Sequence, residues 1–537
     1  MRRRNILKAL VRATVGCVAL VVFSQAASAC TNILVSRGAS EDGSVIVSFN
    51  VDGAGAGILH RTPAGLPSSG AEDAAGADWD RPTYQVLGFM NDQQLSFGET
   101  TTVGHRPEFD TPGEGVPYHR LLFLTLQRCK TAREGINEIN RLVQKYGYGS
   151  TPEVFSIGDK NEVWIMEIVS KGPDERGAVW VAARVPDGYI TAHANMNRIR
   201  TFPLDDPENW LYSADVVTYA TEKGYYDPTQ GKPFSFQDAY HATITKYQRR
   251  ACAGRVWSIY RRAAPSQDFP VGYFRGEDGA EDYPLFIKPD KKLSVQDVMT
   301  LMRDHFEGTP YDMTKGVDAG PFGSPYRYRD LTWTVGDKTY GWERPVSSQQ
   351  AACCWIAQSR NWLPDMIGGI FWYAPDDAYT SCFAPFYCGI SEVSQPYQTG
   401  DFGKFTWDSA WWVHNIVSNY AYDRWSRVIP DIQKAQAEVE SKTFKMLPII
   451  EKTAMELGKN DPKLVREYLT NYCMTNGDAT FRRWEQLATD VFTKHNDGWV
   501  KEPGDAPKGV GYPQEWLEHV VKDRADELLI DEPLPEH

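Results

Sequence analysis

The chain has 537 residues with a formal net charge of −13, and 42% of its residues are hydrophobic. This length and hydrophobic content are typical of a folded protein of about three structural units and exclude a disordered chain. The acidic balance argues against nucleic acids and anionic membrane surfaces as partners, and no apolar run reaches the ~18 residues that a membrane span requires.

The first 29 residues have the pattern of a secretory signal. Residues 2–12 carry five basic residues and no acid, residues 15–23 form a short apolar run, and Ala27-Ser28-Ala29 places small residues before a cleavage site. We expect cleavage after Ala29, which would make Cys30 the first residue of a periplasmic or secreted bacterial protein.

A cysteine at that position would carry a thiol and a free α-amine on the same residue. The α-amine has an ordinary pKa of about 7.7–8, against about 10.4 for lysine, so it can act as a base near neutral pH. N-terminal nucleophile hydrolases combine nucleophile and base in this way. Two other interpretations stay open: the lipid attachment site of a lipoprotein, which usually has a larger aliphatic residue where Ala27 stands, and a cysteine buried in the first strand.

Strands dominate the region after Cys30. The β-rich runs at residues 32–36 and 45–49 flank a turn at Asp42-Gly43 and predict a hairpin. Residues 53–80 are rich in Gly and Ala and predict a loop, and residues 133–146 have the apolar spacing of a helix. Four more strands are predicted, with the spacing of a meander, at residues 153–157, 163–168, 179–184 and 189–193.

The second half changes from short elements to long helices. Residues 200–400 are dense in Gly, Pro and aromatic residues, with short helices such as residues 294–305. After Asp408 the pattern predicts amphipathic helices at residues 411–423, 431–457, 461–474, 481–494 and 514–528. We therefore divide the chain into a signal peptide (residues 1–29), a catalytic body (residues 30–408) and a mostly helical extension packed on it (residues 409–537).

Common motifs for metal sites, phosphate binding and serine hydrolases are absent from the sequence. It contains no H-E-x-x-H, no C-x-x-C and no G-x-S-x-G, and the glycines of residues 53–57 lack the G-x-G-x-x-G spacing. We expect neither a metal nor an organic cofactor. Among the nine cysteines, Cys382 and Cys388 could form a local disulfide in an oxidising compartment, whereas Cys353 and Cys354 are expected to pack in the interior.

Several stretches resemble peptidase family C69, a group of N-terminal nucleophile cysteine dipeptidases. Their order and spacing cover most of the chain after residue 29. They are residues 30–35, 40–44, 50–52, 162–167, 180–188, 194–199, 358–360, 363–364, 368–369, 372, 384–387 and 411–412.

The resemblance implies a fold and a chemistry. The fold would be α+β, a four-layer αββα N-terminal nucleophile hydrolase sandwich with a helical C-terminal extension. Cys30 would attack the scissile carbonyl and form a thioester that water hydrolyses. Asn195 would donate to the oxyanion, Asp52 would hold the Cys30 amine or the substrate's ammonium, and Arg255 would polarise the amine and the thiol.

The same resemblance leaves substrate preference open. Relatives commonly carry an arginine where this chain has Phe49, so that charge is missing or comes from elsewhere, with Arg198 as the candidate. Arg198 and Asn197 are the predicted substrate-binding residues. The expected partners are short peptides, with no nucleic acid and no stable membrane insertion, and a homo-oligomer stays open. The alternatives are a non-peptide linear amidase with the same nucleophile and a lipid-anchored envelope binding protein.

Overall fold

The computed structural model describes residues 30–65 and 83–530. The predicted signal sequence and its cleavage site before Cys30 lie outside the described residues. Among the helices of these two ranges, none combines the length and the apolar character needed to cross a bilayer.

A six-stranded antiparallel sheet contains the hairpin predicted after Cys30. All side chains of its two strands are buried, because both faces of the sheet are covered. The strand order is β10-β1-β2-β14-β15-β16. The strands are β1 (Thr31–Val35), β2 (Val45–Asp52), β10 (Ile190–His193), β14 (Ala351–Ser359), β15 (Ile370–Pro375) and β16 (Ala384–Tyr387).

A second, eight-stranded antiparallel sheet has the order β11-β9-β8-β7-β6-β5-β4-β3. The predicted meander is confirmed for β7, β8 and β9, but it is wrong for β10, which crosses to the other sheet and pairs with the edge of β1. The strands are β3 (Arg61–Thr62), β4 (Val86–Leu87), β5 (Met90–Asn91), β6 (Ser96–Thr101), β7 (Glu153–Gly158), β8 (Val163–Ser170), β9 (Ala178–Arg184) and β11 (Trp210–Tyr212).

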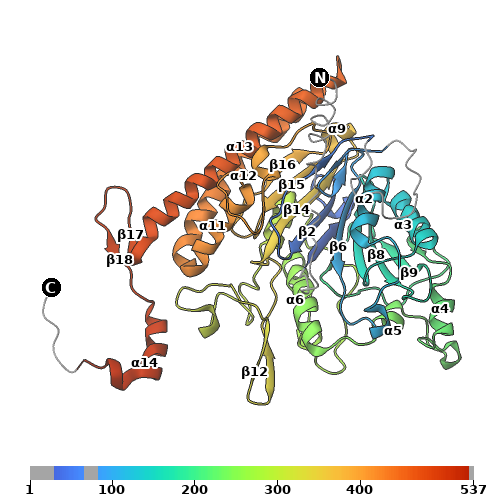
Figure 1. The fold of residues 1–537 in the computed structure, drawn as a ribbon, viewed down its shortest axis with the longest axis horizontal. Helices are drawn as coiled ribbons and strands as arrows, with labels where there is room; N and C mark the ends of the chain where they lie inside the picture. The colour runs from blue at the N-terminus through green and yellow to red at the C-terminus, as the bar shows by residue number, and fades with distance from the viewer. Residues whose placement is uncertain (1–29, 66–82, 531–537) are drawn as a thin grey trace, which may run out of the picture.

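The two sheets stack face to face, with helices on both outer faces (Figure 1). Strands β1 and β2 pack on β6, β7 and β8. Helices α2 (Tyr118–Arg128) and α3 (Ala132–Tyr146) cover the eight-stranded sheet, and α6 (Lys246–Ala263) and α8 (Val295–Met302) cover the six-stranded one. The predicted α+β class is confirmed, and the elements form four layers in the order helix, sheet, sheet, helix.

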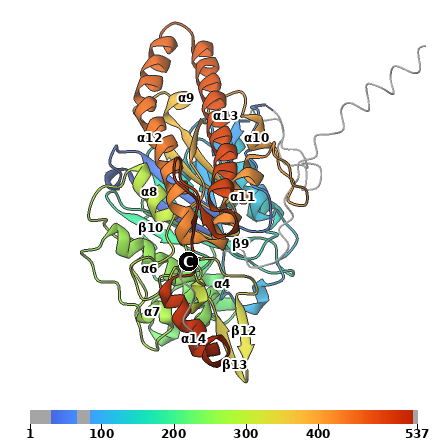
Figure 2. The same cartoon turned by 90° about the vertical axis from the view of Figure 1, so that its left-hand side faces the viewer.

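Three long helices follow the predicted change of pattern after Asp408. They are α11 (Ala410–Asp423), α12 (Trp425–Gly458) and α13 (Pro462–His495), which pack together (Figure 2). They also pack against β15 and β16. The prediction of two helices at residues 461–474 and 481–494 is wrong, because α13 runs unbroken through both. Gly477 lies in its middle, where a Cβ atom would come within 3.1 Å of Ser394 Cβ, so the glycine permits close packing of α13. Helix α14 (Gln514–Leu528) is present as predicted.

The remaining described elements are short. They are α4 (Val216–Glu222), α5 (Phe236–Tyr240), α7 (Gly272–Arg275), α9 (Asp365–Gly368), α10 (Gln395–Gln398), β12 (Thr332–Val335), β13 (Lys338–Gly341), β17 (Trp499–Val500), β18 (Lys508–Gly509) and five 3-10 turns at Arg37–Ala39, Pro107–Phe109, Pro228–Gln230, Val317–Ala319 and Asn496–Gly498.

All eight cysteines in the described ranges are free and buried. The disulfide considered between Cys382 and Cys388 is not formed. The thiol of Cys388 donates to the carbonyl oxygen of Asp365 at 3.4 Å, whereas Cys382 lies beside the Arg303–Glu440 ion pair. Cys353 and Cys354 are buried in β14, as expected.

Candidate active site

The predicted site residues meet at one end of the six-stranded sheet. In an antiparallel sheet the start of each strand lies beside the ends of its neighbours. Cys30 precedes β1, which pairs Thr31 with Asn50 of β2 and Asn32 with His193 of β10. Asp52 ends β2 on one side of Cys30, and Asn195 follows β10 on the other side.

Arg255 connects two of these residues. It lies on α6, whose first turn is fixed by a capping box between Thr245 and Gln248, and its side chain is fully buried. Nη1 donates to the carbonyl oxygen of Cys30 at 2.7 Å and to Thr31 Oγ1 at 2.9 Å, and Nη2 donates to Asn195 Oδ1 at 2.9 Å. Burial lowers the pKa of Arg255 to about 10, so the guanidinium remains charged at neutral pH.

Asn195 is held in one orientation. Its φ of 56° lies in the left-handed region, which asparagine adopts more readily than most residues. Oδ1 accepts from Arg255, and Nδ2 donates to the carbonyl oxygen of Thr101 in the facing sheet at 2.7 Å. These contacts fix the amide orientation, since a guanidinium needs an acceptor and a carbonyl needs a donor. Among the described residues, Thr101 is the one acceptor that Nδ2 reaches.

Asp52 is paired with two arginines. Its buried carboxylate accepts from Arg344 Nη2 at 3.0 Å and lies 3.3 Å from Arg329 Nη2. These arginines flank the β12–β13 hairpin, which projects at the bottom of Figure 1. Phe49, where an arginine was expected, packs instead against Phe89 and Trp355. The positive charge at this end of β2 therefore comes from Arg329 and Arg344.

The Cys30 thiol is buried, with 2% of the residue exposed. Burial raises its pKa well above the ordinary value, and the charges of Glu99 and Asp52 raise it further, while the backbone N–H of Asp52 opposes them. The thiol is therefore protonated at neutral pH. Because the thiolate is the reactive form, attack by Cys30 requires a base that accepts its proton.

Two buried glutamates that the sequence analysis did not name lie on the face of the eight-stranded sheet that packs on α2 and α3. Glu99 on β6 and Glu153 on β7 are diagonal neighbours, because Glu153 pairs with Thr101. Burial raises the pKa of Glu99 to about 7, and burial together with the charge of Glu99 raises that of Glu153. No sequence pattern predicted this pair, since the two acids stand 54 positions apart and the strand at Ser96–Thr101 was not predicted.

Asn197 and Arg198 form hydrogen bonds with other parts of the protein. Asn197 Nδ2 donates to Glu167 Oε2 at 2.7 Å, and the Arg198 backbone N–H donates to Glu167 Oε1. The guanidinium of Arg198 donates to the carbonyl oxygens of Ala192, Tyr283 and Pro284 at 2.7–3.1 Å. Glu167 thus anchors the turn that follows Asn195, and both predicted substrate-binding side chains bind protein groups.

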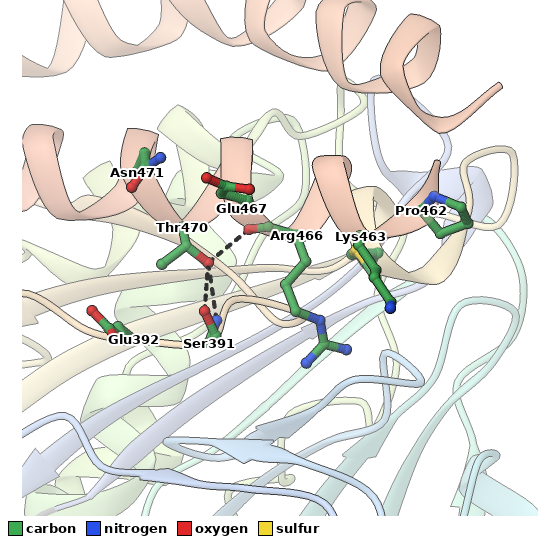
Figure 3. Close-up of a pocket in the computed structure, with 9 residues that line it drawn as sticks. Ser391, Glu392, Pro462, Lys463, Arg466, Glu467, Thr470 and Asn471 are labelled. Carbon is green, nitrogen blue, oxygen red and sulfur yellow. Dashed lines mark hydrogen bonds between the residues drawn. The ribbon is translucent and has the colours of Figure 1, made fainter. Parts of the chain in front are cut away.

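A cavity elsewhere on the protein is shown in Figure 3. It lies between α13 and the turn at residues 391–392, where the Ser391 backbone N–H donates to Thr470 Oγ1 at 3.0 Å. Its lining mixes the cations Lys463 and Arg466 with acids and includes none of the residues around Cys30. In the ranges that the structure covers, no three His, Cys, Asp or Glu side chains are grouped so that they could hold a metal ion.

Comparison with known proteins relates the chain to one family. The model of peptidase family C69 matches residues 66–438, which include Glu99, Glu153, Asn195 and Arg255. A "Probable dipeptidase" of Latilactobacillus sakei is 25% identical over 76% of this chain and 85% of the relative. A "Probable dipeptidase" of Salmonella dublin is 26% identical over 70% and 85%, and "Dipeptidase A" of Lactobacillus helveticus is 24% identical over 72% and 81%. The chain belongs to peptidase family C69, and the protein is a hydrolase that acts on peptide bonds.

Proposed function

We propose that the protein is a cysteine-dependent dipeptidase whose nucleophile is Cys30. The relatives named as dipeptidases support the substrate class. The observation that carries the mechanism is the position of Arg255, which bonds both the main chain of Cys30 and the side chain of Asn195. One buried cation thereby connects the candidate nucleophile to the candidate oxyanion donor.

Removal of residues 1–29 precedes catalysis and frees the α-amine of Cys30. The amine accepts the thiol proton as Sγ attacks the carbonyl carbon of the first residue of the substrate. The Nδ2 group of Asn195 donates to the oxyanion that forms, and one such donor lowers the barrier by about 3–4 kcal/mol. The C–N bond then breaks, the leaving amine takes the proton, and water hydrolyses the thioester to release the first amino acid and the thiol.

The proposal includes the architecture and the location of the enzyme. The four layers correspond to an N-terminal nucleophile hydrolase sandwich formed by residues 30–408, with residues 409–537 as a helical extension. The sequence pattern of residues 1–29 supports export to the periplasm or the medium, where short peptides would be the substrates.

Intact mass and turnover of protein secreted with its own leader test this proposal. We expect a mass equal to that of residues 30–537 with an unmodified amine, hydrolysis of a dipeptide such as Ala-Ala, and complete loss of turnover in Cys30→Ala. Cys129→Ala is the matched control, because it removes a buried thiol at the end of α2. A lipid adduct on Cys30, a cut elsewhere, or full activity in Cys30→Ala would contradict the proposal.

A further inference from the structure

Helix α14 buries none of its side chains. Its one ion pair among the described residues joins Arg524 to Glu527 within the helix itself. Figures 1 and 2 show α14 projecting from one end of the molecule, away from the two sheets. A lone helix of about 15 residues is only marginally stable in water, because most helical stability in proteins comes from packing. The described chain therefore does not supply the contacts that α14 needs.

Large apolar side chains are exposed along α14 and just after it. They are Leu517, Val521, Leu528, Leu529 and Ile530. Leu517 and Val521 are four residues apart, so they lie on the same side of the helix, before its kink at Arg524. A single exposed apolar residue is ordinary, but a contiguous group marks a surface that binds a partner.

The charge of α14 restricts the chemistry of that partner. The helix carries five acids and two bases. The acids that form no ion pair with a described residue are Glu515, Glu518, Asp523 and Asp526. Nucleic acids and anionic membrane surfaces repel such a helix. The complementary surface is therefore both basic and apolar.

The outer face of α12 is a surface of this kind. Met446 and Ile449 are three residues apart, which places them on one side of the helix, and they are 38% and 57% exposed. Lys442, Lys445 and Lys452 are exposed beside them, and none of these lysines forms an ion pair with a described residue. We call these five residues the α12 face.

Two other groups of exposed apolar side chains lack this positive charge. The β12–β13 hairpin exposes Val335 and Tyr340 beside one acid and one base. The loop at residues 401–408 exposes three aromatic rings beside two acids and one base. Opposite charges across an interface favour the correct partner and like charges disfavour the wrong one. The α12 face is thus the better match for α14.

The α12 face and α14 lie at opposite ends of the pair formed by α12 and α13 (Figures 1 and 2). The ring of Tyr512, just before α14, lies 5.9 Å from that of Phe322 and borders the same cavity as His495, the last residue of α13. Ile449 lies in the other half of the pair, near the connection between α12 and α13. At 1.5 Å per residue, Ile449 is roughly 35 Å from His495 along the helices, whereas α14 is about 22 Å long. Helix α14 therefore cannot reach the α12 face of its own chain.

We propose that the protein forms a dimer in which α14 of each copy docks on the α12 face of the other copy. Two copies related by a two-fold axis make both contacts at once, because the axis brings the α14 end of each helix pair to the opposite end of its partner. Neither surface contains a residue of the candidate active site, so the dimer and the catalytic proposal are tested separately.

Sedimentation velocity of the mature enzyme at micromolar concentrations gives the first test. Wild type should sediment as a dimer. A chain that ends at Tyr512 should be a monomer, because it lacks α14 and the apolar residues that follow it. High salt should weaken the wild-type dimer, since exposed charges are screened.

A pair of charge-reversed variants tests which surfaces meet. The first variant carries Lys442→Glu, Lys445→Glu and Lys452→Glu, and the second carries Glu515→Lys, Glu518→Lys and Asp523→Lys. Each alone should dimerise at least about 10-fold more weakly than wild type, because like charges then face each other. An equimolar mixture should form a heterodimer, because both of its contacts again join opposite charges.

The matched control carries Lys232→Glu, Lys288→Glu and Lys292→Glu, which make the same change of charge at exposed lysines outside α12. It should dimerise like wild type. A monomeric wild type, whether or not it binds lipid vesicles, would overturn the inference. A dimer that survives truncation at Tyr512, or a mixture of the reversed variants that stays monomeric, would overturn it as well.

Discussion

Arg255 binds the main chain of Cys30 from a helix outside the sheet, with Nη1 2.7 Å from the Cys30 carbonyl oxygen. The contact joins positions 225 residues apart. It fixes the main chain of the residue that carries the candidate nucleophile, and the same guanidinium also orients the Asn195 amide. Arg255 is thus a positioning residue in the proposed mechanism.

Arg255→Lys should lower kcat about 10- to 100-fold with little change in KM. A lysine ammonium is a point charge on a flexible stem and cannot reproduce the planar set of donors that contacts Cys30, Thr31 and Asn195 together. Steady-state kinetics with a dipeptide measure the effect. Arg262→Lys is the control, because Arg262 lies on the same helix and pairs with Asp304. Equal losses in both variants would argue against a positioning role.

Asn195→Ala should lower kcat about 100- to 1,000-fold, as the loss of one oxyanion donor does in other hydrolases. The variant also leaves the Thr101 carbonyl oxygen and one Arg255 donor without their present partner, so its thermal stability must be measured alongside. A loss of kcat below about threefold in a folded variant would exclude Asn195 as the oxyanion donor.

The sequence predicted the parts of this site that lie next to strand ends. Cys30 could be predicted from the leader pattern, and the hairpin that follows it from β-rich runs around a turn. Arg329 and Arg344 could not, because they contact Asp52 across 277 and 292 residues and lie in a region without regular spacing. The crossing of β10 escaped prediction for a similar reason. A strand that is buried on both faces has the same sequence pattern in either sheet. Which sheet β10 joins depends on the free edge of β1, with which it pairs.

Asp52 and Arg344 should show strong energetic coupling. Breaking a buried ion pair by removal of one partner typically costs about 3–5 kcal/mol, and loss of both partners costs less than the sum of the two single losses. The double-mutant cycle of Asp52→Asn and Arg344→Met, measured by urea unfolding, should give a coupling of about 1–3 kcal/mol. The cycle of Asp52→Asn with Arg329→Met should give less, because the Arg329 side chain is 35% exposed. Additive effects for Arg344 would show that the pair does not stabilise this end of β2.

Ser156→Ala should destabilise the fold by about 1–3 kcal/mol without lowering kcat. Ser156 Oγ lies 2.7 Å from His193 Nε2 and donates to Asn32 Oδ1 at 3.1 Å, so it connects the two sheets below the site. Loss of the hydroxyl leaves buried polar groups unpaired. Burial lowers the pKa of His193 to about 3, with Arg198 and Arg255 adding to the effect, so this histidine stays neutral at working pH. A large loss of kcat in the stable variant would instead indicate that His193 takes part in the reaction.

The buried pair of Glu99 and Glu153 should make the wild-type protein less stable as pH rises. Burial raises the pKa of Glu99 to about 7 from an ordinary 4.5, so between these values the folded protein keeps a proton that the unfolded chain releases. The unfolded state then binds fewer protons, and the free energy of unfolding falls with pH by up to about 1.4 kcal/mol per pH unit for one proton. This stabilisation is fully present below about pH 4.5 and is lost as pH rises through about 7.

Glu99→Gln removes this titration, so its stability relative to wild type should increase between pH 5 and pH 7.5. Urea unfolding at four pH values in that range measures the difference, in which contributions cancel for groups that Glu99 does not influence; Glu153, whose pKa the charge of Glu99 raises, changes with it. Glu138→Gln should show a flat difference over the same range. Although burial acts to raise the pKa of Glu138, its ion pairs with Arg141 and Arg128 hold it below the ordinary value, so it titrates below pH 5. Parallel curves for wild type and Glu99→Gln would mean that the pair is ionised in the folded enzyme, and that a cation within the protein compensates it.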